Sequence, residues 1–171
     1  MIMLDLFSGK GGASKAMRAR GWTVVTVDNE PSFNPDIVAD LTTWTWDGGP
    51  VDLLWASPPC QEFAREFMPW CRTGKAPSLE LVQATYRLVK EINPRWWILE
   101  NVKGAQPWIG RARWIRNPIY LWGEFPPIYL NRLKPWKERL SSRADAARAA
   151  MPYELSLAVA QSIEESLPCP I

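Results

Sequence analysis

Val51-Asp52-Leu53-Leu54-Trp55-Ala56-Ser57-Pro58-Pro59-Cys60-Gln61 is the stretch that decides how this sequence folds. Residues 51–56 form an apolar run of the length of a buried strand. The run ends at two prolines, which lack a backbone N–H and fix φ, so the strand cannot continue through them. Cys60 therefore stands on a stiff turn at a strand end, and in an open α/β sheet ligands bind at that edge. We interpret Cys60 as a nucleophile; the alternative is a small buried apolar residue.

Length and composition indicate one globular domain. The chain has 171 residues, of which 47% are apolar and 22% charged, a usual balance for a domain with a sizeable core. No apolar run reaches about 18 residues, so no membrane span is expected. The start, Met1–Asp5, enters a strand directly and lacks the features of a secretory signal. Three cysteines without a CxxC pair do not make a disulfide framework, which favours a reducing cytoplasm.

The chain contains no histidine. This excludes histidine acid–base catalysis and histidine metal ligands, and without a CxxC pair no structural zinc site is expected. We therefore predict no metal site. Eleven tryptophans are an unusual number; most are expected in the core, and several could stack on nucleic-acid bases.

The net charge of +2 is unevenly distributed. From Arg111 to Arg148, nine Lys and Arg residues stand against three Asp and Glu, whereas the remainder has eleven against fifteen. A basic segment of this kind could bind nucleic acid. It is equally typical of a solvated helical face, so charge alone leaves both interpretations open.

The chain opens with a strand, a glycine turn and a helix. Residues 2–7 predict the strand, Ser8–Gly12 the turn, and residues 13–20 a helix that Gly21 closes. This order is the opening of a nucleotide-binding βαβ unit. The spacing Gly9-x-Gly11-Gly12 differs from GxGxxG, so ordinary turn glycines are the alternative.

Acidic residues follow the next two strands. Residues 22–27 predict a strand that ends at Asp28-Asn29-Glu30, and residues 37–39 a short strand that ends at Asp40. An acid at the end of the second strand is the usual partner of a ribose hydroxyl. A helix cap or a solvated acid is the alternative for Asp28.

A long loop and a helix follow Ser57–Gln61, which we call the Pro-Cys turn. Residues 61–77 lack a clear period and predict a loop with room for one helical turn, of a length that is usually mobile or functional. Ser78 is predicted to cap a helix that runs to about Glu91. Residues 95–99 then predict a strand that delivers Glu100-Asn101-Val102 at its end. The apolar face of the helix is expected to consist of Leu79, Val82, Tyr86 and Val89.

The pattern weakens after residue 102. Residues 119–122 predict a strand, 144–150 favour a helix, and 153–166 predict a last helix. The apolar side of this last helix is expected to consist of Leu155, Ala158, Val159 and Ile163.

Four turns thus meet at one edge of the expected sheet, namely Gly9–Gly12, Asp28–Glu30, Ser57–Gln61 and Glu100–Val102. The sequences of three of them occur together in one enzyme family. Asp5-Leu6-Phe7-Ser8-Gly9-Lys10-Gly11-Gly12, Ser57-Pro58-Pro59-Cys60-Gln61 and Glu100-Asn101-Val102, in this order, resemble the motifs of the DNA cytosine-5 methyltransferases. The resemblance runs from about Leu4 to Val102 and resumes weakly at Arg111–Arg113 and in the last helix. It implies an α/β fold, namely the Rossmann-like class I fold of S-adenosylmethionine-dependent methyltransferases, with a mostly parallel central sheet and helices on both faces.

The residue types suit the chemistry of that family. Carbon 5 of cytosine is too weak a nucleophile to take a methyl group directly, and addition of a thiolate to carbon 6 activates it. By resemblance, Cys60 is the nucleophile and Glu100 the acid near ring nitrogen 3. A glutamate beside Trp97 and Leu99 could have a raised pKa, which this role needs. A salt-bridge partner is the alternative for Glu100.

The resemblance also implies the remaining site residues. Arg111 and Arg113 would join the catalytic group, although Gly110 stands where the family usually has glutamine. Asn101 would orient the loop that carries Cys60, and residues 61–77 would close over a base flipped out of DNA. The S-adenosylmethionine site would comprise Phe7, Ser8, Gly9, Gly11, Gly12, Asp28, Asn29, Asp40, Leu41 and Pro58. The substrate would be contacted by Ser57, Pro59, Gln61 and Asn101.

The chain departs from the family in size. Family members carry a separate target-recognition region between the arginine motif and the last helix, where only about 35 residues intervene here. We expect a single methyltransferase domain, 1–171, in which a reduced basic segment, 111–150, replaces that region. Recognition would be minimal, or would come from this segment or from a second chain, with short or relaxed sequence specificity. Such an enzyme would act in the cytoplasm of a bacterium, as its own protein or that of a phage.

Two other functions stay open. One is the same chemistry on RNA, such as a tRNA cytosine. The other is a non-catalytic subunit that binds nucleic acid or cofactor and needs a partner, which the missing recognition region favours. Retention of both Cys60 and Glu100 favours an enzyme. Asp5 is expected to support the glycine turn and not to act in catalysis.

Overall fold

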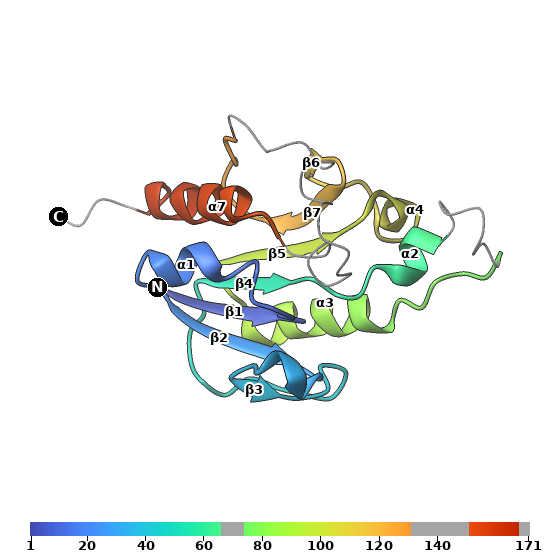
Figure 1. The fold of residues 1–171 in the computed structure, drawn as a ribbon, viewed down its shortest axis with the longest axis horizontal. Helices are drawn as coiled ribbons and strands as arrows, with labels where there is room; N and C mark the ends of the chain where they lie inside the picture. The colour runs from blue at the N-terminus through green and yellow to red at the C-terminus, as the bar shows by residue number, and fades with distance from the viewer. Residues whose placement is uncertain (66–73, 131–150, 168–171) are drawn as a thin grey trace.

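One sheet of seven strands organises the computed structural model, which describes residues 1–65, 74–130 and 151–167 (Figure 1). Along the sheet the strands lie in the order β3-β2-β1-β4-β5-β7-β6. The strands are β1 (Ile2–Leu6), β2 (Thr23–Asp28), β3 (Ile37–Val38), β4 (Leu53–Ala56), β5 (Trp96–Asn101), β6 (Trp114–Arg116) and β7 (Ile119–Glu124). The α-helices are α1 (Lys15–Ala19), α2 (Gln61–Arg65), α3 (Glu80–Ile92), α4 (Gln106–Ile109) and α7 (Tyr153–Glu165).

Five of these strands are parallel, and the sheet reverses direction at one edge. β1 lies between β2 and β4 and is parallel to both, while β3 and β5 extend the parallel part. β7 runs antiparallel to β5, and β6 antiparallel to β7. The mostly parallel sheet predicted from the sequence is therefore confirmed.

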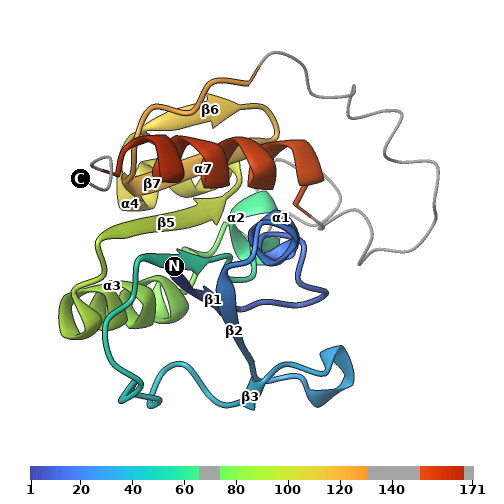
Figure 2. The ribbon, with the colours of Figure 1, turned by 90° about the vertical axis from the view of Figure 1, so that its left-hand side faces the viewer.

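Helices cover both faces of the sheet, as expected (Figures 1 and 2). α1 and α7 pack on one face, over buried side chains that include Met3 and Trp55. α3 packs on the other face, over Leu4 and Leu54. Successive residues of a strand point to opposite faces, which explains why strands buried on both sides read as unbroken apolar runs.

The last helix is confirmed, and it fastens the end of the described chain to its start. The Ser156 hydroxyl accepts the N–H of Ala16 at 3.3 Å and donates to the carbonyl of Ala13. The Glu164 carboxylate accepts the indole N–H of Trp22 at 2.8 Å and pairs with Arg20. The predicted apolar residues are all buried, namely Leu155, Ala158, Val159 and Ile163.

The helix predicted after Ser78 is confirmed as α3, and one residue of its predicted apolar face, Tyr86, is wrong. Leu79 occupies the N-cap position, and the Ser78 hydroxyl accepts the N–H of Glu80, the first residue of α3, at 3.3 Å. Tyr86, predicted on the apolar face, is 37% exposed, although its ring packs against Trp97 in a T-shaped arrangement. The buried positions of the helix are Val82, Ala84, Thr85 and Leu88.

The boundaries of other elements differ from the predicted ones. β5 includes Glu100 and Asn101, predicted to follow the strand, because β7 pairs with both of them. α1 begins only at Lys15, since the turn continues through Ser14. α4 and β6 were not expected, and α2 is the helical turn predicted within residues 61–77. The predicted helix at 144–150 lies outside the described residues. In the part of the chain that the structure describes, no helix has the length and apolar character to cross a membrane.

Candidate active site

The predicted turns lie at one edge of the sheet because β1, β2, β4 and β5 are parallel. Their carboxyl ends are Leu6, Asp28, Ala56 and Asn101. The glycine turn, the acid, the Pro-Cys turn and Glu100 thus share the edge at which open α/β sheets bind ligands. This grouping is the geometric basis for a candidate active site.

The glycine turn holds its backbone in conformations that L side chains rarely adopt. Phe7 has φ +55°, Gly9 +48° and Gly11 +70°. The N–H of Gly11 donates to the Ser8 carbonyl at 2.8 Å, and the N–H of Gly9 donates to the Asp28 carboxylate at 2.8 Å. Positive φ is free of steric cost only for glycine, so Phe7 is strained, and such strain concentrates at functional sites.

The other residues predicted around the cofactor occupy different environments. Asp28 is buried and also accepts the N–H of Glu30 at 2.9 Å, whereas Asn29 is exposed. Asp40 is exposed, and its carboxylate accepts the N–H and hydroxyl of Thr42, which lowers its pKa. Leu41 lies in the core on the α3 face, so its side chain is explained by packing.

Gly12 has a packing explanation as well. A Cβ at this position would stand 2.8 Å from the backbone N of Met151, at the start of the segment that leads into α7. Only glycine allows this close approach. Packing against Met151 is therefore enough to explain why residue 12 is a glycine, and a contact with the cofactor is not required.

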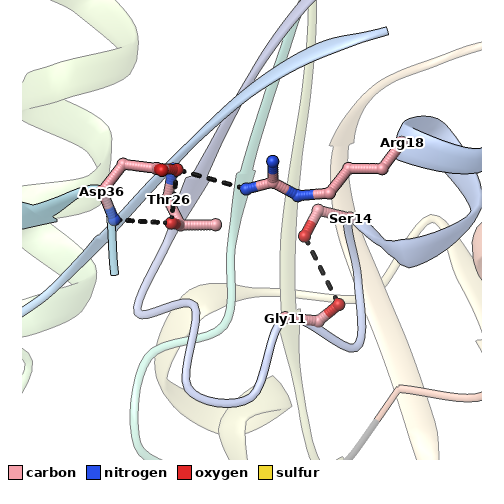
Figure 3. Close-up of polar contacts among 5 residues, drawn as sticks. All are labelled: Gly11, Ser14, Arg18, Thr26 and Asp36. Atoms are coloured by element: carbon pink, nitrogen blue, oxygen red, sulfur yellow. Dashed lines mark hydrogen bonds and ion pairs between the residues drawn. The ribbon is translucent and has the colours of Figure 1, made fainter. Parts of the chain in front are cut away.

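A cleft of about 390 Å³ adjoins the glycine turn on the α1 side. Figure 3 shows Arg18 reaching from α1 toward Asp36, whose carboxylate it meets at 3.1 Å. The same carboxylate accepts the hydroxyl of Thr26 at 2.7 Å, and the Ser14 hydroxyl lies 3.4 Å from the Gly11 carbonyl. All of these residues except Asp36 line the cleft, which leaves the glycine turn accessible from this side.

These features fit the small molecule that the resemblance implies. A Cβ at Gly9 would meet nothing within 4 Å, so open space lies beside its backbone. The Ser8 hydroxyl oxygen is buried and has no hydrogen-bond partner within the described part of the chain. Open backbone, an orphaned hydroxyl and a buried acid form a suitable cradle for S-adenosylmethionine.

The Pro-Cys turn is fixed on both sides. The Ser57 N–H donates to the Leu6 carbonyl at 3.2 Å, and the buried Asn101 amide donates to the Pro58 carbonyl at 3.0 Å. Pro59 is exposed and Cys60 half-buried. The Cys60 carbonyl accepts the N–H of Ala64 at 2.8 Å, so the thiol stands where α2 begins.

Glu100 and Cys60 are coupled electrostatically. Burial raises the pKa of Glu100 to about 7, although a hydrogen bond from the Ser57 hydroxyl opposes this. Burial, and then the charge of Glu100, raise the pKa of the Cys60 thiol. The prediction of a raised pKa for Glu100 agrees with this geometry. The site therefore holds one acid that titrates near neutral pH beside a thiol that prefers to keep its proton.

The structure gives the other predicted residues different neighbours. The Arg113 guanidinium lies over the Phe125 ring at 5.1 Å and points to the Gly123 carbonyl at 3.5 Å. Arg111 is exposed, and Gln61 is the exposed first residue of α2. Within residues 1–65, 74–130 and 151–167, no hydrogen bond or ion pair joins these three side chains to Cys60 or Glu100. Nor does that part of the chain contain a group of three or more Cys, Asp or Glu side chains that could hold a metal ion.

Two residues at this edge were not predicted as site residues. Trp55 is fully buried, and its indole N–H donates to the Ser57 hydroxyl at 3.0 Å. Asp5 is buried beside it on β1, and burial raises its pKa to about 7 despite hydrogen bonds from Ser14. The sequence signal for Asp5 is an acid inside an apolar strand, but nothing in the sequence indicates the indole contact.

Comparisons with known proteins point to one family. Residues 1–107 match the family model described as C-5 cytosine-specific DNA methylase. The chain is 32% identical over 127 residues to the Type II methyltransferase M.AquIA of Picosynechococcus sp., covering 62% of this chain and 50% of that protein. It is also 32% identical over 114 residues to the "Probable DNA (cytosine-5)-methyltransferase" of Frog virus 3, covering 59% and 53%. The solved structure of the S. pombe Dnmt2 methyltransferase matches with a TM-score of 0.45 at 22% identity, over 63% of this chain and 38% of that one. The chain spans about half the length of the curated relatives it matches.

Proposed function

The chain belongs to the C-5 cytosine-specific DNA methylase family, whose methyl donor is S-adenosylmethionine, and we propose that it methylates carbon 5 of cytosine in DNA. The observation that carries this proposal is the coupling of Cys60 and Glu100 at the ligand-binding edge of the sheet. A thiol and an acid that titrates near pH 7 are the two groups that addition to a pyrimidine needs.

In the proposed reaction, the Cys60 thiolate adds to carbon 6 of the flipped cytosine. Glu100 holds a proton at ring nitrogen 3, which draws electrons away from carbon 6 and favours this addition. S-adenosylmethionine, when bound, supplies the methyl group that carbon 5 accepts. A water molecule then takes the proton from carbon 5, the electrons of that C–H bond restore the double bond between carbons 5 and 6, and the Cys60 thiolate leaves. Asn101 keeps the turn in place through the Pro58 carbonyl.

Target recognition would involve the basic part of the chain that follows α4. We propose that the basic segment 111–150, or a second chain, takes the place of a separate recognition region within a single methyltransferase domain, 1–171. Arg111 and Arg113 at the start of this segment would hold the base and a phosphate. A cytoplasmic place of action follows from a bacterial or phage DNA substrate.

Transfer of tritium from labelled S-adenosylmethionine to duplex DNA tests the proposal. Label in DNA should resist RNase and disappear in Cys60→Ala, while Cys71→Ser keeps it and serves as the matched thiol control. DNA that contains 5-fluorocytosine should form a covalent adduct with the wild type and none with Cys60→Ser, because fluorine blocks loss of the group at carbon 5. Label in RNA alone would replace the DNA substrate by RNA. Cofactor binding without transfer to either nucleic acid would replace the enzyme by a binding subunit.

A further inference from the structure

Trp55 satisfies its buried indole N–H at the Pro-Cys turn and not within the core. Its side chain is fully buried in the core on the α1 and α7 face, yet its indole N–H ends on the Ser57 hydroxyl oxygen at 3.0 Å. An indole N–H can only donate, whereas a serine hydroxyl both accepts and donates. The contact therefore occupies one lone pair of the hydroxyl and leaves its O–H to point elsewhere.

The parallel pairing of β4 and β5 places Ser57 beside Glu100. β4 and β5 are parallel, with Trp55 level with Ile98 and Ala56 level with Leu99, so Ser57 and Glu100 follow at the same height. Trp55 and Ile98 belong to the same core cluster, and the residues two positions further along each strand share this face. This register brings the Ser57 hydroxyl beside the Glu100 carboxyl group, where hydrogen bonding from Ser57 lowers the pKa of Glu100 against the effect of burial.

A second tryptophan shows that the contact is not a general feature of this face. Trp96 on β5 packs against the same core cluster, and its buried indole N–H has no hydrogen-bond partner among the described residues. Trp55 and Trp96 thus differ in what their N–H groups reach, although both rings serve the same core. Trp96 offers a matched control for Trp55.

We propose that Trp55 is a positioning residue that acts on Glu100 through the Ser57 hydroxyl. This inference rests on the proposed function, in which Glu100 carries a proton to the base. Because the indole fixes the oxygen of Ser57, the O–H is aimed at the carboxylate before any substrate arrives. The hydrogen-bonded series from Trp55 through Ser57 to Glu100 would hold the orientation of Glu100 and set the pH at which Glu100 keeps its proton.

Other groups near Glu100 could in principle set its protonation. Cys60 faces it from the turn after β4, and Tyr120 lies on β7 opposite Asn101. Arg113 is bonded through its backbone to Leu121, the residue opposite Glu100, but its guanidinium is engaged with Phe125. Asp5 lies level with Trp55 on β1 and also titrates near pH 7, so an experiment must separate it from Glu100.

Nitrogen-15 NMR of the tryptophan indole groups tests the proposal in the full chain. The Trp55 resonance is identified by its loss in Trp55→Phe. In the wild type it should shift with a midpoint near pH 7, because the Ser57 hydroxyl passes the ionisation of Glu100 to the indole. This shift should vanish in Glu100→Gln and in Ser57→Ala, and persist in Asp5→Asn. A Trp55 resonance that does not titrate, or one that stops titrating only in Asp5→Asn, overturns the proposal.

Carbon-13 labelling of glutamate carboxyl groups gives a second measurement, with the Glu100 signal identified in Glu100→Gln. Ser57→Ala should raise the Glu100 midpoint by about one pH unit, because a hydrogen bond to the charged form is lost. Ser57→Thr should restore the midpoint. Trp55→Phe should raise it by less, and should add nothing in combination with Ser57→Ala. Trp96→Phe should leave it unchanged.

The variants also separate the two proposals. Full additivity of Trp55→Phe and Ser57→Ala, or an equal effect of Trp96→Phe, contradicts the role of Trp55, whatever the protein methylates. If the Trp55 and Glu100 titrations change in the variants as expected but no nucleic acid receives label, the role of Trp55 is confirmed and the proposed function fails. If methyl transfer occurs, the pH profile of its rate should move with the Glu100 midpoint in Ser57→Ala.

Discussion

At the scale of single residues, the coupling of Cys60 and Glu100 decides which protonation state can react. The Glu100 charge raises the pKa of the Cys60 thiol, so an ionised Glu100 works against the thiolate. A protonated Glu100 would therefore carry the proton for the base and would also make the Cys60 thiolate easier to form. Since burial raises the Glu100 pKa to about 7, this proton is available near neutral pH.

Removal of the Glu100 charge should make Cys60 more reactive even without substrate. We expect Glu100→Gln to increase the rate of Cys60 alkylation by iodoacetamide at pH 8.5 by a factor of about 3 to 10, because only the thiolate reacts. The rate can be followed by mass spectrometry in a chain with Cys71→Ser and Cys169→Ser. Glu62→Gln is the matched control, since Glu62 lies on α2 close to Cys60 in sequence but binds the N–H of Ser78. An unchanged rate in Glu100→Gln, or an equal rise in Glu62→Gln, would contradict the coupling.

At the scale of elements, β7 approaches β5 closely at a single glycine. Gly123 pairs with Ile98 and has φ +131°, and a Cβ there would stand 2.1 Å from the Trp97 carbonyl oxygen. We expect Gly123→Ala to lower the free energy of unfolding by about 2–4 kcal/mol, through both strain and displacement of β5. Urea unfolding followed by tryptophan fluorescence measures the change.

A second glycine separates the two contributions at Gly123. Gly49 also has a positive φ, +90°, but a Cβ there would meet nothing within 4 Å. Gly49→Ala should therefore show the backbone strain alone and cost about 1–2 kcal/mol. Equal losses in the two variants would mean that the contact with β5 does not matter. Because β5 carries Glu100, Gly123→Ala should also shift the pH at which Glu100 titrates, whereas Gly49→Ala should not.

The elements that the sequence predicted correctly are those with local causes. β4 is a short apolar run stopped by two prolines, and α7 has an apolar side of helical period, so both follow from neighbouring residues. The face of α3 is set instead by the strands beneath it, which the local pattern does not contain. β6 exists only through pairing with β7, and three residues give no recognisable period.

The candidate site divides in the same way. The positions of Cys60, Asp28 and Glu100 at one edge of the sheet could be predicted because proline, glycine and strand ends fix them there, and their roles stay predictions. The packing of Gly12 against Met151 and of Arg113 against Phe125 could not, because each joins segments that are far apart or irregular in sequence. The contact between Trp55 and Ser57 spans only two residues, yet it depends on a ring orientation that the core determines.

At the scale of the whole molecule, two carboxyl groups, buried Asp5 and half-buried Glu100, tie folding to pH. Burial raises the pKa values of Asp5 and Glu100 to about 7, from values near 4 in an unfolded chain. Between these values the folded state binds more protons than the unfolded state, so the free energy of unfolding should fall as the pH rises from about 4 to about 7. Asp36 and Glu164 have lowered pKa values, and their contribution is lost only as the pH falls below about 4.

Asp5→Asn should flatten this dependence, because asparagine keeps the shape and the acceptor for Ser14 but cannot ionise. Each unit of pKa corresponds to about 1.4 kcal/mol, so between pH 5 and pH 8 the wild type should lose a few kcal/mol more than Asp5→Asn. Urea unfolding at the two pH values measures the difference. Asp36→Asn serves as the control: it should be less stable than the wild type at both values, with the same change between them, because its titration lies below this range. An equal fall in Asp5→Asn and the wild type would mean that the folded protein admits water or a counter-charge to Asp5, so that its pKa is not raised by burial.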